Sequence, residues 1–123
     1  MKPWLTSGQQ LQTIFLCPGA VIKLKAPIVY TAQRQVITTK GLPTDDTRAT
    51  LVVTGGGQSV AIYGTCVKCS GTRLANVQVN GNRPALGWIG VFSGALIEMG
   101  GSSSGQVVDQ VHSYGEQCSD NTL

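Results

Sequence analysis

The sequence predicts an all-β protein, a right-handed parallel β-helix of about four coils. One stretch, Ser70–Asn82 (SGTRLANVQVNGN), alternates apolar and polar residues from Val77 to Asn80, as a strand with one buried face does. A related stretch, Ser104–Gln117 (SGQVVDQVHSYGEQ), follows 34 residues later. Short strands that recur in the same order are typical of stacked units, none of which can bury its apolar face alone.

The two stretches align residue by residue. The aligned pairs are Ser70/Ser104, Gly71/Gly105, Leu74/Val108, Val77/Val111, Gln78/His112 and Gly81/Gly115. A further strand precedes each stretch, Val60–Gly64 before the first and Ala95–Met99 before the second. A β-sandwich is the alternative because it also contains short, closely spaced strands, but it explains the ordered repeat less well.

The alignment also predicts which residues face the core. The expected inward residues are Leu74, Val77, Val79, Val108, Val111 and Ser113. Gln78 is expected to face outward above His112, on the surface where a ligand would lie. Small polar residues beside the turns, such as Asn76 and Asn80, are expected to bond the backbone of those turns.

The remaining elements follow from alternation and turn residues. Strands are expected at Thr13–Cys17, Val21–Lys25, Ile28–Tyr30, Val36–Thr39 and Ala49–Thr54. The first could instead be a short helix capped by Ser7, but Pro18 leaves no room for a further helical turn. Leu42–Asp46 and Gly55–Gly57 are turns, and Asn82–Ser93 is a longer loop. A single domain spans 1–123, with polar irregular ends at about 1–12 and 116–123.

Composition limits the classes of function. An apolar fraction of 41 % excludes a disordered chain, and a net charge of +3 is far from the dense basic signature of a nucleic-acid binder. No apolar run approaches 18 residues, so no membrane span is predicted. The first five residues are followed by a polar segment instead of an apolar one, so no signal peptide is expected.

The four cysteines are Cys17, Cys66, Cys69 and Cys118, and they allow three disulfide connectivities. Cys66 and Cys69 form a single C-x-x-C. A structural zinc site usually has a second close pair, which this chain lacks, so free or disulfide-bonded cysteines are predicted, with no metal and no cofactor. A redox motif is not favoured, because no βαβ pattern surrounds the pair.

The candidate catalytic residues are Asp45, Asp46, Asp109 and His112. Asp45 and Asp46 are the only adjacent carboxylates, and paired acids catalyse glycoside hydrolysis. Their place in a turn favours a turn-capping role, with Arg48 pairing with one of them at the surface. His112 is the only histidine, and a solvated surface position is the competing interpretation.

A second set of residues is predicted to bind a sugar polymer, because cations attract uronates and aromatic rings stack on sugars. The set is Lys23, Lys25, Arg73, Gln78, Arg83, Trp88 and His112. The cations are expected to face outward. Trp88 and Phe92 could alternatively cover the edge of the core beneath their loop.

Several segments resemble fungal secreted proteins of the pectin-lyase-like, right-handed parallel β-helix superfamily. They are LCPGAVI (16–22), API-Y (26–30), GLPTDDTRATLVV (41–53), NVQVNGNRPALG (76–87) and ALIEMGG (95–101), within about residues 14–114. The resemblance implies a parallel β-helix, an extracellular location and a cell-wall polysaccharide context. Members usually have many more coils and a capped first coil, so this chain resembles a truncated member whose uncapped ends could self-associate.

These observations predict a β-helix protein that interacts with pectin-like polysaccharide, without catalysis in this short form. The expected partner is a polysaccharide, with no nucleic acid and no membrane. The alternative is a non-enzymatic secreted interaction or effector protein, or a self-associating structural protein. A third candidate is a polysaccharide hydrolase or lyase.

Overall fold

The computed structural model describes residues 12–87, 95–101 and 103–116, and its strands form three parallel sheets. Sheet A contains β1 (Thr13–Leu16), β4 (Val36–Thr39), β7 (Arg73–Ala75) and β10 (Val107–Asp109). Sheet B contains β2 (Val21–Leu24), β5 (Ala49–Val53), β8 (Val77–Asn80) and β11 (His112–Tyr114). Sheet C contains β3 (Ile28–Val29), β6 (Ile62–Gly64) and β9 (Ile97–Met99). The predicted all-β class is confirmed.

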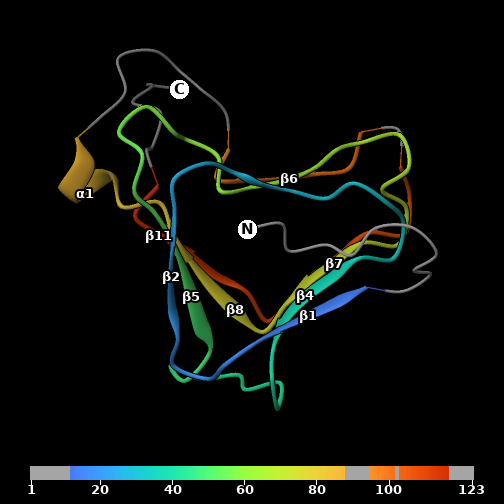
Figure 1. Ribbon diagram of the computed structural model, residues 1–123, viewed down its shortest axis with the longest axis horizontal. Helices are drawn as coiled ribbons and strands as arrows, with labels where there is room; N and C mark the ends of the chain where they lie inside the picture. The colour runs from blue at the N-terminus through green and yellow to red at the C-terminus, as the bar shows by residue number, and fades with distance from the viewer. Residues whose placement is uncertain (1–11, 88–94, 102, 117–123) are drawn as a thin grey trace, which may run out of the picture.

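The chain visits the sheets in the fixed order A, B, C, and each strand pairs with the equivalent strand of the next circuit. Figure 1 shows the sheets as three sides around a common interior. We call each circuit a coil: β1–β3, β4–β6, β7–β9 and β10–β11. Every strand pairing among the described residues is parallel, which contradicts the β-sandwich alternative and fits a β-helix-like arrangement.

The 34-residue repeat gives the correct register between the third and fourth coils. Leu74 pairs with Val108 in sheet A, and Gln78 pairs with His112 in sheet B. The preceding strands also pair as expected, with Ile62 beside Ile97 in sheet C. Both of those strands are shorter than predicted, because β6 begins at Ile62 and β9 at Ile97.

The prediction of one strand over Ser70–Asn82 is wrong. The chain changes sheets at Asn76, whose φ of 53° lies in the left-handed region, so β7 and β8 belong to different sheets. Gln110 makes the same corner one coil later, with φ 54°. Asparagine tolerates this conformation better than most residues. Asn76 Nδ2 donates to the carbonyl oxygens of Leu42 (3.2 Å) and Pro43 (3.0 Å), which confirms the bonding to a turn that was expected for Asn76.

The core lies inside the three sheets. Leu74, Val77 and Val79 are fully buried, as predicted, and Ile37, Leu51 and Ile62 from the second coil pack into the same cluster. The inward residues of the fourth coil are less covered, because no described strand lies beyond β10 and β11. Val108 is 49 % exposed, and Ser113 is also exposed.

Three further findings concern the predicted loop after β8, the expected absence of a membrane span and the pairing of the cysteines. The predicted loop at Asn82–Ser93 begins with a short helix, α1 (Arg83–Leu86), and its remainder from residue 88 lies outside the described residues. No described helix has the length and apolar character needed to cross a bilayer. Cys66 and Cys69 are joined in a disulfide, Cys17 is exposed and bonded to no described cysteine, and Cys118 lies outside the described residues.

Substitution of Asn76 tests the corner. Asn76→Gly keeps access to the left-handed region but loses the two side-chain bonds, which should lower the free energy of unfolding by about 1 kcal/mol. Asn76→Val adds left-handed strain at a β-branched residue and should lower it by roughly 1–3 kcal/mol more. Urea unfolding followed by circular dichroism measures both. Equal stabilities for the two variants would contradict the assignment of backbone strain.

Candidate functional site

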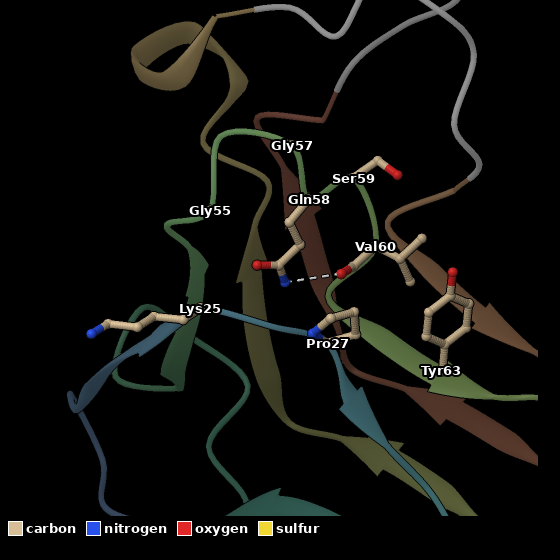
Figure 2. Close-up of a pocket in the computed structure, with 8 residues that line it drawn as sticks. All are labelled: Lys25, Pro27, Gly55, Gly57, Gln58, Ser59, Val60 and Tyr63. Carbon is tan, nitrogen blue, oxygen red and sulfur yellow. Dashed lines mark hydrogen bonds between the residues drawn. The ribbon is translucent and has the colours of Figure 1, made fainter.

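An open cleft of about 440 Å³ lies at the corner between sheets B and C (Figure 2). Lys25 and Pro27 come from the turn between β2 and β3, and Tyr63 comes from β6. The turn between β5 and β6 supplies the rest of the lining, namely Gly55, Gly57, Gln58, Ser59 and Val60. The volume is within the range of small-ligand sites. Two successive coils therefore build one concave surface.

The glycine-rich turn keeps its shape through local bonds. The Gln58 amide donates to the Gly55 carbonyl (3.0 Å), and Gln58 Nε2 donates to the Val60 carbonyl (3.0 Å), as Figure 2 shows for the second bond. A Cβ at residue 55 would lie 3.2 Å from Gln58 Oε1 and 3.3 Å from the Lys25 carbonyl oxygen. Glycine at this position lets the turn approach the preceding coil closely.

The buried side chain of Arg83 donates hydrogen bonds to the backbone of this glycine-rich turn. Its Nη1 donates to the Gly56 carbonyl (2.8 Å), and its Nη2 donates to the carbonyls of Gly55 and Gln58 (both 3.1 Å). The outward orientation expected for Arg83 is wrong, because the residue is only 2 % exposed. Its guanidinium has five donors in a planar fork, and that geometry suits a turn that offers several carbonyl oxygens.

Two cationic side chains lie at or near the cleft, Lys25 in its lining and Arg83 bonded to its glycine-rich turn. The bonds of Arg83 among the described residues go to carbonyl oxygens, so its buried charge is not neutralised by a carboxylate there. Lys25 adds an exposed cation to the lining, and no acidic residue is among the lining residues. A partly buried charge acts through a lower dielectric than water and is felt more strongly than a fully solvated one. The described lining therefore contains a cation and no carboxylate.

A second group of predicted residues lies on the outer face of sheet B. Gln78 is only 9 % exposed, because it lies in register between Thr50 and His112. Its Nε2 donates to the Arg48 carbonyl (3.3 Å) and to Thr50 Oγ1 (3.4 Å), which leaves Oε1 to face His112 Nδ1 at 3.3 Å. His112 also lies 5.0 Å from the ring of Tyr114. Lys23 belongs to the same sheet, in β2, and is exposed.

The candidate catalytic residues are spread over different surfaces. Asp109 forms an ion pair with Arg73 (3.3 Å) on sheet A, where both side chains are about half exposed and the pair contributes little. Asp45 and Asp46 lie exposed in the turn between β4 and β5, and His112 lies in β11. None of the four lines the cleft. Trp88 lies outside the described residues.

Asp45 has the turn-capping role that its position predicts. Its Oδ1 accepts bonds from the Thr47 hydroxyl (2.6 Å) and the Thr47 amide (2.9 Å). These bonds, led by the one from the hydroxyl, lower the pKa of the Asp45 carboxyl. Arg48 was expected to pair with the carboxylate of Asp45 or Asp46, but among the described residues it forms no such ion pair. Its side chain donates to the backbone carbonyls of Asp45 and Gln110 (both 2.9 Å) and so connects the second coil to the fourth.

Sequence reasoning identified Lys25 but missed its neighbours in the cleft. Gln58, Ser59 and Tyr63 carry no motif, and Tyr63 reads only as part of a strand. The run Gly55–Gly57 is the one available signal, because consecutive glycines mark a place where the backbone comes close to another group. Among the described residues, no three His, Cys, Asp or Glu side chains are grouped so that they could hold a metal ion.

Comparison of the chain with protein-family models, with curated proteins and with solved structures finds no match.

Replacement of Arg83 tests its support of the cleft. Arg83→Met removes a donor from three carbonyl oxygens, of which the Gly55 carbonyl keeps its bond from the Gln58 amide, and should lower the free energy of unfolding by about 3 kcal/mol. Arg83→Lys keeps the charge but not the planar fork, so it should lose roughly half as much. Urea unfolding gives the stabilities, and hydrogen exchange at the Gln58 amide should be faster in both variants. Wild-type exchange at Gln58 in Arg83→Met would contradict the role described.

The depressed pKa of Asp45 predicts a pH-dependent contribution to stability. A carboxyl whose folded-state pKa lies below its ordinary value of 3.8 stabilises the fold above that value. The contribution is lost as the pH falls through the folded-state pKa. Asp45→Asn should therefore be less stable than the wild type at pH 6, and the difference should shrink as the pH falls below 3.8. Asp46→Asn, with the same change of charge one residue away, is the control for urea unfolding over this pH range.

Proposed function

We propose that the chain is a closed, right-handed parallel β-helix of about four coils, of the pectin-lyase-like type, that binds cell-wall polysaccharide without catalysing its cleavage. The observation that carries the proposal is the cleft between sheets B and C. It is open, and it combines one aromatic ring, one exposed cation and several polar groups on a rigid stack of strands.

The chemistry of the cleft supports a sugar polymer as the ligand. Tyr63 offers a ring on which a sugar can stack, and Ser59 adds a hydroxyl to the lining. Lys25 and the buried charge of Arg83 favour a sugar that carries a carboxylate. An open cleft also suits a polymer, because the parts of the polymer outside the cleft can extend into solvent.

The positions of the acidic residues support binding in preference to cleavage. Glycoside hydrolysis requires two carboxyl groups that flank the scissile bond, within about 10 Å of each other. The cleft contains no acidic residue among those that line it, and the candidate acids lie in sheet A and in the turn before β5. The resemblance to secreted pectin-lyase-like proteins favours an extracellular polysaccharide as the partner.

Binding of polygalacturonate, compared with a neutral xylan, tests the proposal. In affinity electrophoresis, Tyr63→Ala should weaken retention by both polymers, and Lys25→Met should weaken retention by polygalacturonate about five- to tenfold, as expected for the loss of roughly 1 kcal/mol. Lys40→Met, which removes an exposed cation outside the cleft, is the matched control.

Further variants and assays separate the alternatives. Tyr114→Ala changes the outer face of sheet B and should leave retention unchanged. Loss of binding in that variant, with normal binding by Tyr63→Ala, would move the site to the surface that carries His112. Failure of the folded wild type to bind any polymer would favour the non-enzymatic interaction protein, and release of reducing ends or unsaturated products would favour the hydrolase or lyase.

A further inference from the structure

The turn between β6 and β7 carries a disulfide, Cys66–Cys69, that the proposed polysaccharide site does not use. We propose that this turn is a thiol–disulfide exchange site, at which Cys66 reacts with a thiol or disulfide partner and Cys69 is the internal resolving residue. The proposal is independent of polysaccharide binding. It rests on the unequal exposure of the two cysteines and on the bonds that hold the turn without the disulfide.

The two sulfur-bearing residues differ in accessibility. Cys69 is completely buried, whereas Cys66 is partly exposed. The residues between them face solvent, since Val67 is 79 % exposed and Lys68 is also exposed. A thiolate that attacks a disulfide must reach one sulfur directly, and access decides which one is attacked. An incoming thiolate therefore reacts at Cys66, and Cys69 is the leaving group.

The exchange can be written with all atoms and electrons assigned. A partner thiolate, RS⁻, attacks Cys66 Sγ. The new bond joins R–S to Cys66, the Cys66–Cys69 bond breaks, and its electron pair goes to Cys69 Sγ, to which the proton that the partner thiol lost on forming RS⁻ is returned. A second thiolate, from a small thiol or a cysteine of another protein, then attacks the partner sulfur and releases Cys66. Two partner thiols have become one disulfide, and the protein holds a dithiol. The reverse sequence reduces a partner disulfide.

The turn is held by bonds that do not involve sulfur. The Cys69 amide donates to the Cys66 carbonyl (3.1 Å) and to Ser103 Oγ (3.1 Å), and Ser103 Oγ donates to the Cys66 carbonyl (2.7 Å). Thr72 Oγ1 donates to the Cys69 carbonyl (2.9 Å). Ser103 belongs to the next coil, so the turn is fixed to the stack. The backbone can therefore hold the two thiols close together after reduction, and the disulfide can form again.

Two further features suit exchange at this turn. Lys68 places an exposed cation one residue from Cys69 and two residues from Cys66 in the chain, and a cation near an accessible cysteine favours the reactive thiolate. Cys69 Sγ lies 3.6 Å from the Tyr30 carbonyl oxygen, which can accept a bond from the thiol after Cys69 has been released. The released thiol therefore has a partner inside the core.

Mixed-disulfide formation tests the proposal in a chain that carries Cys17→Ser and Cys118→Ser, so that only the pair can react. Cys69→Ser leaves Cys66 alone, and Cys66→Ser leaves Cys69 alone. With oxidised glutathione, Cys66 should form the mixed disulfide at least about tenfold faster than Cys69, because only Cys66 is accessible. Mass spectrometry measures the rates, and circular dichroism checks the fold. Equal rates in folded variants, or a faster Cys69, would overturn the proposal.

A second experiment uses the intact pair and does not depend on the folding of the single variants. The chain with Cys66 and Cys69 is equilibrated with mixtures of reduced and oxidised dithiothreitol or glutathione, quenched with acid and mapped by mass spectrometry. The pair should open and close reversibly with the β signal retained, and glutathione should be found on Cys66. A disulfide that stays closed in excess dithiothreitol, or a fold lost on reduction, would show that the disulfide is only a structural link.

Discussion

Parallel, in-register pairing between successive coils is the constraint on which the rest of this structure depends. Each strand must place its apolar residues over those of the strand before it, because neither coil can bury them alone. The column formed by Ile37, Leu74 and Val108 in sheet A shows the consequence, since burial is complete inside the stack and only partial in the last coil. The turns that form the cleft and carry the disulfide connect these strands, so the strand pairing determines where both turns lie.

Much of this arrangement could be predicted from the sequence, because the spacing of apolar residues indicates where the strands lie and that they recur at a fixed interval. The pairs Leu74/Val108 and Gln78/His112 followed directly from the repeat. The corner at Asn76 was not predicted, because the alternation starts only at Val77 and the odd spacing between the buried residues Leu74 and Val77 does not by itself distinguish a change of sheet from an irregular strand. The burial of Arg83 was also hidden, because its partners are carbonyl oxygens, and every residue has one.

Arg83 and Ser103 show how the stack supports chemistry at its corners. Arg83 follows β8 and holds the turn of the coil before it, and Ser103 precedes β10 and holds the disulfide turn of the coil before it. In both cases one coil supplies the side chain and its neighbour supplies the turn. Among the described residues, the buried cation of Arg83 bonds carbonyl oxygens, and a charge in such a low-dielectric place acts more strongly on its surroundings than a fully solvated one.

The lengths of the corners have a separate consequence. Equivalent positions of sheet A are 23 residues apart from Thr13 to Val36, 37 from Val36 to Arg73, and 34 from Arg73 to Val107. The strands stay in register although the connecting segments differ by many residues. Such a scaffold accepts insertions at its corners without disturbing the ladders, because loop length costs little once the strands are fixed. New binding loops could thus be grafted at these corners, and related chains could diverge there while keeping the same stack.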